Sequence, residues 1–212
     1  ARYGLTAAAV AGKVYAIGGL PAGTKNEAYD PATNTWDGTR ASPPMGVTWA
    51  GSAVANGRIY LVGGGVWNQE YDPGTNTWLL KAALSSNRNY VGVAAVDGKV
   101  YALGGWDGAY LNLADRYDPG TNAWTNVQGL GLARYGAAVG VVNGRIYVAG
   151  GDGWGVGATA GVEEARPPVL PAGATYSFTL TGQVGAVCGA TAVSNTGWVS
   201  AASACASQST FT

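Results

Sequence analysis

The stretch Tyr29-Asp-Pro-Ala-Thr-Asn-Thr-Trp36 returns as Tyr71-Asp-Pro-Gly-Thr-Asn-Thr-Trp78 and again as Tyr117-Asp-Pro-Gly-Thr-Asn-Ala-Trp124. Each copy keeps Tyr and Trp seven residues apart. Asp-Pro followed by Thr-Asn is turn chemistry, because Pro fixes φ and Asn either caps a turn or enters the left-handed region. The stretch therefore predicts two strands joined by a tight turn, repeated along the chain.

A second repeated element lies upstream of each stretch, where a short apolar run carrying Tyr ends in a glycine pair. The pairs are Gly18-Gly19, Gly63-Gly64, Gly104-Gly105 and Gly150-Gly151, at spacings of 41 to 46 residues. A two-residue turn precedes each run: Ala11-Gly12, Asn56-Gly57, Asp97-Gly98 and Asn143-Gly144. The last three are pairs that a type I′ hairpin favours. With a small-residue strand before each turn, every repeat predicts four antiparallel strands, which is one propeller blade.

These elements resemble the kelch family over residues 1–166. The resemblance implies an all-β fold of kelch-type β-propeller blades, with the small-residue strand innermost and the Trp of the outermost strand packed against a neighbouring blade. The fourth repeat departs from the pattern, since Glu164-Ala165-Arg166-Pro167-Pro168 replaces the expected stretch and no Trp follows at the expected place. We expect three complete blades plus a degenerate fourth. They either close as an unusually small ring, close through other chains, or belong to a longer protein.

Residues 167–212 contain none of the chain's charged residues and predict a separate, small C-terminal β segment. The stretch from Pro171 to Thr181 resembles the start of Ig-like repeats in prokaryotic surface proteins. Cys188 and Cys205 are the only cysteines and lie seventeen residues apart. We expect them to form a disulfide in an oxidising compartment, with free buried thiols as the alternative.

An uncharged β segment lacks the Lys and Glu side chains that normally protect sheet edges, so we expect it to be covered. It either packs on the propeller and completes the fourth blade, or adds a strand to a neighbouring molecule. The second arrangement would give self-association through residues 167–212.

Composition excludes several classes of function. Twelve basic and twelve acidic residues cancel, which removes the electrostatic basis for binding nucleic acid. The chain has no His, so Ser-His-Asp catalysis and His-based metal sites lose their residue. No apolar run approaches the roughly 18 residues of a membrane helix. We expect no catalytic residue, no metal, no cofactor and no membrane insertion. The chain opens at Ala1, so we expect any sorting signal to lie outside it.

Arg2, Arg88 and Arg134 occupy one repeated position, eleven residues before each glycine-pair strand, where the second repeat has Val47. In kelch proteins that bind acidic peptides, Arg at this position faces the partner. The resemblance thus implies a small cationic ring, flanked by Tyr3 and Tyr135. The alternative is that each Arg bridges to the next blade.

The loops after the glycine pairs carry aromatic residues interleaved with short polar ones. They are expected to share one face with the arginine loops. This composition is typical of a carbohydrate-binding surface and equally of a protein-interface hot spot. The candidate ligand-binding residues in these loops are Trp67, Trp106, Asp107, Tyr110, Asp152 and Trp154.

The sequence therefore predicts a non-catalytic binding module, extracellular or at the cell surface, that recognises a protein or glycan through propeller loops. Only 11% of the residues are charged, and Gly, Trp and Tyr are abundant, which is typical of turn-rich extracellular β-proteins. A second hypothesis is a structural subunit of a surface filament or lattice assembled through the neutral tail. A third is the non-catalytic part of a kelch-type sugar oxidase, since the copper-ligating His residues of that group are missing.

Overall fold

The computed structural model describes residues 1–165, 195–199 and 207–211. The chain divides into two compact units, Ala1–Pro168 and Val169–Thr212. All regular elements in the described residues are β-strands, so the predicted all-β fold class is confirmed. None of these residues forms a helix of the length and hydropathy that crossing a membrane would take.

Three antiparallel sheets have four strands each, and within each sheet every strand pairs with the next along the chain. Blade 1 consists of β1 (Tyr3–Val10), β2 (Lys13–Leu20), β3 (Asn26–Asp30) and β4 (Thr35–Asp37). Blade 2 consists of β5 (Ala50–Ala55), β6 (Arg58–Gly63), β7 (Asn68–Asp72) and β8 (Thr77–Leu80). Blade 3 consists of β9 (Gly92–Val96), β10 (Lys99–Leu103), β11 (Ala114–Asp118) and β12 (Ala123–Val127). The three complete blades predicted from the sequence are confirmed.

Blade 4 is the predicted degenerate blade. Its strands are β14 (Ala138–Val142), β15 (Arg145–Ala149) and β18 (Val162–Ala165), and no fourth strand follows within the described residues. The sequence of this repeat also lacks the Asp-Pro turn and the Trp that the other three repeats have at this point. A small sheet of β13 (Arg134–Tyr135), β16 (Asp152–Gly153) and β17 (Gly157–Ala158) joins loops of the same repeat.

The second unit contributes one antiparallel hairpin of β19 (Asn195–Val199) and β20 (Ser207–Phe211). The predicted small C-terminal β segment is confirmed to that extent. Cys188, Cys205 and the stretch that resembles an Ig-like repeat lie outside the described residues.

The first two strands of every blade are joined by the same tight turn. Asn56, Asp97 and Asn143 have φ between 50° and 51°, and the glycine after each also has positive φ. This is the type I′ geometry that the sequence predicts. Ala11-Gly12 adopts it as well, with φ of 51° and 74°, although Ala gains nothing from the left-handed region.

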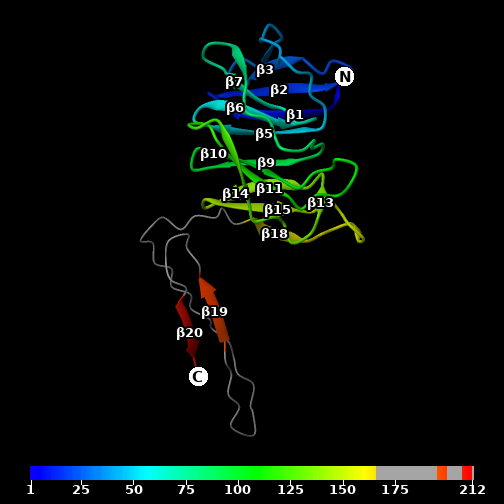
Figure 1. Cartoon of the computed structure of the whole chain (residues 1–212). Coiled ribbons are helices and arrows are strands. Elements are labelled where there is room, and N and C mark those ends of the chain that lie inside the picture. The colour runs from blue at the N-terminus through cyan, green and yellow to red at the C-terminus, as the bar shows by residue number, and fades with distance from the viewer. Residues whose placement is uncertain (166–194, 200–206, 212) are drawn as a thin grey trace. The chain divides into compact units, whose positions relative to one another are not determined.

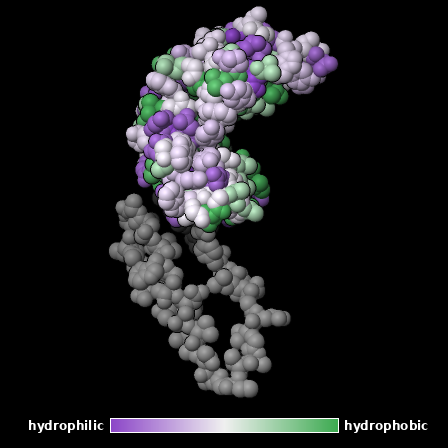
Figure 2. Space-filling view, turned by 90° about the vertical axis from the view of Figure 1, so that its right-hand side faces the viewer, coloured by the Kyte–Doolittle hydropathy of each residue, from purple (hydrophilic) through white to green (hydrophobic). Residues whose placement is uncertain are grey.

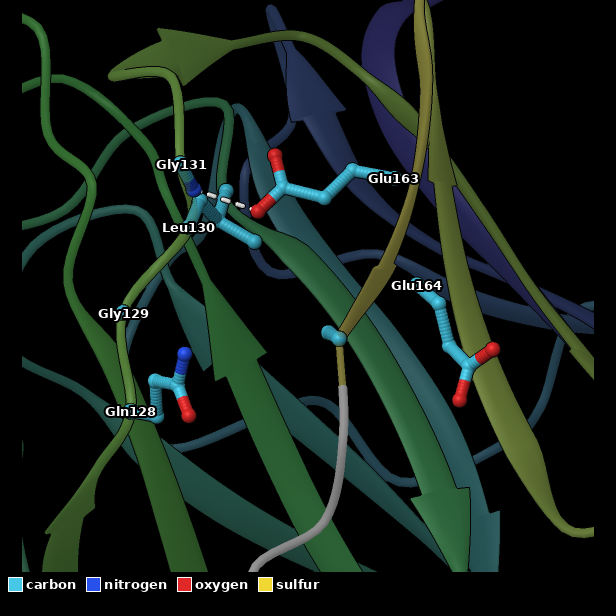
Figure 3. A pocket seen from close by; sticks show the side chains of 7 residues that line it. Gln128, Gly129, Leu130, Gly131, Glu163 and Glu164 are labelled. Carbon is cyan, nitrogen blue, oxygen red and sulfur yellow. Dashed lines mark hydrogen bonds between the residues drawn. The ribbon is translucent and has the colours of Figure 1, made fainter. Parts of the chain in front are cut away.

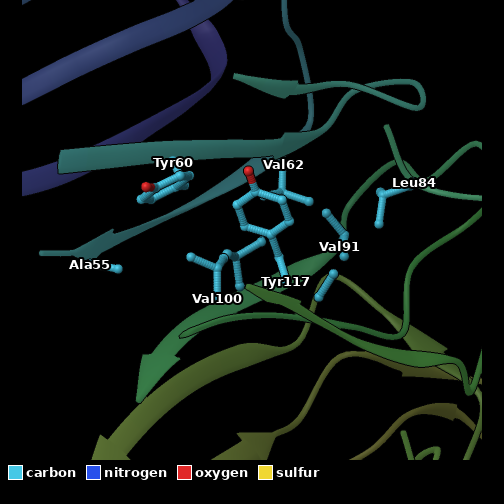
Figure 4. Close-up of a cluster of buried hydrophobic side chains, with 9 residues drawn as sticks. Ala55, Tyr60, Val62, Leu84, Val91, Val100 and Tyr117 are labelled. Atoms are coloured by element: carbon cyan, nitrogen blue, oxygen red, sulfur yellow. The ribbon is translucent and has the colours of Figure 1, made fainter. Parts of the chain in front are cut away.

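The blades stack face to face in chain order, with blades 1 and 4 at opposite ends (Figure 1). Strand β5 packs against β1 and β9, and β9 packs against β5 and β14. The hydrophobic core therefore lies in three joints between blades. In the joint between blades 2 and 3, Tyr60 and Val62 cover Val100 and Tyr117 (Figure 4). Residues at the same repeat positions form the other two joints: Tyr15, Ile17, Ile59 and Tyr71, and Tyr101, Leu103 and Ile146.

The recurring Tyr–Trp stretch holds the preceding blade by its backbone. The Asn76 side-chain oxygen accepts a hydrogen bond from the Ala41 N–H at 2.9 Å, and the Trp78 indole N–H donates to the Ala41 carbonyl at 2.8 Å. The Tyr71 hydroxyl orients Asn76 through a 2.7 Å bond. Asn122 and Trp124 hold Ala82 in the same way. We call this arrangement the backbone clamp.

The glycine pairs form a second contact to the following blade. The N–H groups of Gly19, Gly64 and Gly105 donate at 2.8–2.9 Å to main-chain carbonyls at the start of the next repeat. A Cβ on the first glycine of each of these pairs would collide with the same carbonyl. The pair is therefore required wherever a blade is followed by another.

Replacing Ala11 by Asn should stabilise the protein by about 0.5–1 kcal/mol, because Asn tolerates the left-handed φ that Ala adopts at a cost. Urea unfolding followed by tryptophan fluorescence measures the difference. Asn143→Ala is the matched control, since the Asn143 side chain makes no hydrogen bond within the described residues. The Asn143→Ala variant should have a free energy of unfolding that is lower by a similar amount. A destabilising Ala11→Asn would show that the turn is not the source of strain.

Candidate ligand-binding face

The two predicted sets of loops lie together at one end of the sheets. Strand β13, which leads into the innermost strand of blade 4, pairs with β16, which follows the glycine pair. Isolated bridges join Gly65 to Arg88 and Asn89 to Trp106. The loops before the innermost strands and the loops after the glycine pairs therefore form one continuous face.

The three arginines of this face are turned into their own blades. Arg88 is fully buried, donates to the Ala102 carbonyl at 3.2 Å and forms an ion pair with Asp115. Arg2 pairs with Glu27 in the same way. Arg134 is also buried, with bonds to the Gly150 and Gly161 carbonyls at 3.1 and 3.2 Å and to Glu163 at 3.4 Å. The structure therefore places no cationic ring on the surface and no arginine bridge to the next blade.

Blade 2 replaces this charged pair by a neutral one. Its residue at the arginine position is the buried Val47, and Gln69 stands where the other blades have the acid. The Gln69 side-chain amide binds the backbone N–H and carbonyl of Met45 at 2.9 and 3.1 Å. Comparing the repeats at both positions, rather than at the arginine alone, would have revealed the pairing.

Replacing Arg88 by Val should destabilise the protein by about 3–5 kcal/mol, because Asp115 is left buried without its cation. The double variant Arg88→Val with Asp115→Gln copies the neutral pair of blade 2 and should recover most of that loss. Equilibrium urea unfolding measures both. A double variant as unstable as the single one would show that the arginine acts by other contacts.

Aromatic rings from all four repeats form a continuous row along this face, which we call the aromatic row. Trp49 and Tyr90 stack with ring centroids 4.8 Å apart and an interplanar angle of 29°. Tyr3 lies 5.7 Å from Trp49 on one side, and Tyr135 lies 5.4 Å from Tyr90 on the other. The members of the row are Tyr3, Trp49, Tyr90, Trp106, Tyr110, Tyr135 and Trp154.

Near blade 4 the row widens and is fixed by one carboxylate. Tyr135 lies 5.3 Å from Tyr110 and 5.6 Å from Trp106, and Trp154 lies 5.6 Å from Tyr110. The hydroxyls of Tyr110 and Tyr135 both donate to the same Asp152 oxygen, at 3.0 and 2.9 Å. These hydrogen bonds to Asp152 raise the pKa of both phenols. The rings are thus held in place before any ligand arrives.

Trp49 and Tyr90 hold a backbone conformation that bulky residues rarely adopt. Their φ angles are 62° and 54°, while Gly4 and Gly136 occupy the corresponding positions of blades 1 and 4 with φ of 66° and 65°. The left-handed region costs an L-residue roughly 1–2 kcal/mol. Strain of this kind concentrates at functional sites. The sequence analysis missed both residues, although an alignment of the four loops shows aromatic side chains where the outer repeats have Gly.

A hollow of about 260 Å³ opens between these residues. A ladder of backbone hydrogen bonds crosses it from blade to blade. Trp49 N–H donates to Gly4, Tyr90 N–H to Trp49, and Gly136 N–H to Tyr90, at 2.7–3.0 Å. Figure 2 shows polar and apolar side chains interspersed over one face of the first unit. The hollow is lined by Gly4, Leu5, Trp49, Ala50, Tyr90, Val91, Gly136 and Ala137.

Besides the three inward-turned arginines, two predicted site residues neither belong to the aromatic row nor bond to it. Trp67 is half-buried over Gly65 and contacts no other ring within the described residues. Asp107 is exposed and accepts a 3.2 Å hydrogen bond from the Ala109 N–H, which closes its own loop. Both stay predictions as ligand contacts.

A second cavity, of about 340 Å³, lies beside β18 (Figure 3). It is lined by Glu163, Glu164 and Ala165 together with the segment from Gln128 to Gly131. Glu163 is already engaged, because its carboxylate accepts from the Gly131 N–H and pairs with Arg134. Within the described residues, no group of three or more His, Cys, Asp or Glu could hold a metal ion.

Residues 87–131, which span blade 3 from its first loop to the end of β12, match the Kelch motif family. The third repeat of the chain is thus a kelch motif. The match indicates a protein-binding β-propeller module, since kelch repeats generally mediate contacts between proteins. The comparison with curated proteins gives no match. The glycine pairs lie in or directly after the second strands of the blades, and the clamp Trp residues lie in the outermost strands, whereas most of the aromatic row lies in the loops between strands.

The left-handed backbone at Tyr90 predicts an unusual order of stabilities. Tyr90→Gly and Tyr90→Ala lose the same ring contacts, but Gly adopts positive φ without a penalty. The Gly variant should therefore be more stable than the Ala variant by about 1 kcal/mol. Thermal unfolding by circular dichroism compares the two.

At Tyr29, which lies in β3 without a positive φ, the order should reverse, because Gly in a strand interior is the less stable choice. If Ala is preferred at Tyr90 as well, the loop relaxes and carries no strain.

Proposed function

We propose that this protein is a non-catalytic binding module, extracellular or at the cell surface, that recognises another protein through its aromatic row. The observation that carries the proposal is the row itself, with Trp49 and Tyr90 stacked in a strained backbone conformation above the hollow. The kelch match supports a protein partner.

Trp and Tyr are the residues that dominate binding energy at protein interfaces. Both ends of the row, Tyr3 and Trp154, are exposed large side chains. Their neighbours are oriented by ring contacts and by Asp152, so they lose little freedom when a partner binds. The surface is thus prepared for binding rather than formed by it.

The electrostatics of the face favour an uncharged partner surface. Arg2, Arg88 and Arg134 are neutralised by acids of their own blades, and Asp152 is held by two tyrosines. Affinity should therefore depend little on salt, in contrast to recognition of an acidic peptide.

A neutral glycan is the second candidate partner. The C–H faces of sugars stack on aromatic rings, while hydroxyl groups bind short polar side chains. The row offers rings at centroid separations of 4.8–5.7 Å, with Tyr110, Tyr135 and Asp152 in a hydrogen-bonded group beside them. This combination favours an extended ligand over a single small molecule.

The extracellular placement rests on composition, with 11% charged residues and abundant Gly, Trp and Tyr. A disulfide between Cys188 and Cys205 would support it, and both residues lie outside the described part of the chain. A surface-lattice role for residues 167–212 stays an alternative hypothesis.

Screening on peptide and glycan arrays, followed by titration calorimetry with the strongest hit, tests the proposal. Trp49→Ala and Trp154→Ala should each weaken binding about tenfold or more, because each removes a stacking surface worth about 1.4 kcal/mol or more. Trp36→Ala is the matched control, since Trp36 is exposed on the outermost strand of blade 1, away from the row.

Circular dichroism of each variant separates a lost contact from a lost fold. Hits confined to the peptide array favour a protein partner, and hits confined to the glycan array favour the second candidate. Silent arrays, or equal affinity of Trp154→Ala and the unmodified chain, would count against the aromatic row as the binding surface.

A further inference from the structure

The part of the aromatic row beside blade 4 differs from the rest of the row in geometry and in charge. Its rings gather around the carboxylate of Asp152, and we call them the aromatic corner. They belong to Trp106, Tyr110, Tyr135 and Trp154. The first two lie in the loop after the glycine pair of the third repeat, and the other two lie in the fourth repeat. Backbone pairing of Tyr135 with Asp152, and of Trp106 with Tyr110, fixes these segments.

The rings of the corner stand at steep angles to one another. Trp106 lies at 87° to Tyr110 and at 65° to Tyr135, and Tyr110 lies at 71° to Trp154. The centroids of these neighbours are 5.2–5.6 Å apart. The stacked pair in the middle of the row, by contrast, has an interplanar angle of 29°. A cation interacts with a ring when it lies within about 6 Å of the centroid, so one cation at the corner can interact with several rings.

The corner also holds a negative charge that no cation neutralises within the described residues. Glu27, Asp115 and Glu163, the acids beside the arginines of this face, each form an ion pair. Asp152 forms none there and accepts both phenol hydrogen bonds at one oxygen, which leaves its other oxygen without a hydrogen bond in the same part of the chain. These bonds raise the pKa of both phenols, so the tyrosines stay neutral. They hold the carboxylate in place without removing its charge.

The surroundings of this charge favour a methylated cation over an ordinary ammonium group. A lysine ammonium carries three N–H donors, which need acceptors once water is removed. The ring faces around Asp152 are poor acceptors. A trimethylammonium group has no N–H donor and spreads its charge over methyl groups, which pack against aromatic rings. Asp107, which is exposed in the loop that carries Trp106 and Tyr110, adds a second negative charge nearby.

We propose that the aromatic corner binds the trimethylammonium group of a trimethylated lysine in the partner protein. This inference rests on the proposed function, because it identifies one residue of the protein that the aromatic row recognises. The methyl groups pack against the rings, and Asp152 supplies the opposite charge. The rest of the row contacts uncharged residues that flank the lysine.

A choline headgroup carries the same trimethylammonium group but brings a phosphate beside it. Phosphate is bound most strongly by cationic side chains. The arginines of this face, Arg2, Arg88 and Arg134, are already paired with acids of their own blades. A phosphate beside the corner would also be repelled by Asp152. The charges of the face therefore favour a trimethyllysine over a phosphocholine.

NMR titration of the full chain with small probes, followed through the tryptophan indole N–H signals, tests the inference. The probes are N-acetyl-trimethyllysine amide, the matching unmethylated lysine amide and phosphocholine. The trimethylated probe should bind about tenfold more tightly than either of the others, because it alone combines the methylated cation with the absence of a phosphate.

Two variants separate the charge of the corner from its rings. Asp152→Asn keeps an oxygen that can accept from both tyrosines and removes only the charge, so it should weaken binding of the trimethylated probe about tenfold. Trp154→Ala should weaken it about threefold or more, and the fold should persist because this side chain is 66% exposed. Trp36→Ala is the control, since Trp36 is exposed on the outermost strand of blade 1 and its affinity should be unchanged. Circular dichroism checks the fold of each variant.

Equal affinity for the methylated and unmethylated lysine probes would overturn the inference, and so would an Asp152→Asn variant that binds the trimethylated probe as tightly as the unmodified chain. Tighter binding of phosphocholine than of the trimethylated probe would overturn the assignment to a protein. Array peptides that bind without any preference for trimethyllysine would contradict the role of the corner and leave the proposed function intact. Silent peptide arrays together with selective binding of the trimethylated probe would contradict the proposed protein partner and support the chemistry of the corner.

Discussion

The backbone clamp of Asn76 and Trp78 on Ala41, which Asn122 and Trp124 repeat on Ala82, is the interaction on which the joining of the first three blades depends. It satisfies both the N–H and the carbonyl of one partly buried residue, at 2.9 and 2.8 Å. A hydrogen bond of this kind contributes about 0.5–1.5 kcal/mol. The clamp recognises the backbone of an alanine, Ala41 or Ala82, and not a side chain. Tyr71 supports the clamp from its own turn, so the stretch that folds each outer strand also attaches it to the blade before.

Charge and aromatic surface are separated within the same set of loops. The arginines point into the blades and are neutralised there, whereas the rings of the aromatic row remain at the surface. The buried pairs fix the course of each loop, and Asp152 fixes Tyr110 and Tyr135. A rigid charged layer thus supports an apolar contact layer. This division explains how a chain without net charge can present a well-ordered aromatic face.

The blades were predictable because the turns and the glycine pair of each repeat are encoded by adjacent residues. Asn56-Gly57 and Asp30-Pro31, for example, each specify a turn by themselves. The burial of Arg88 could not be predicted from the sequence. Its partner Asp115 lies far along the chain, and residue 88 by itself does not show whether its guanidinium is exposed or buried. Trp49 and Tyr90 were missed for a different reason. Their importance lies in a positive φ, which is a property of the folded backbone and not of the residue type.

The arrangement of the blades in series also determines the order in which they unfold. Each interior blade is stabilised by two joints and each terminal blade by one, so opening begins at the ends and proceeds inward, as in other repeat arrays. Unfolding blade 2 or blade 3 therefore breaks two joints at once, whereas unfolding blade 1 or blade 4 breaks one joint among the four described blades.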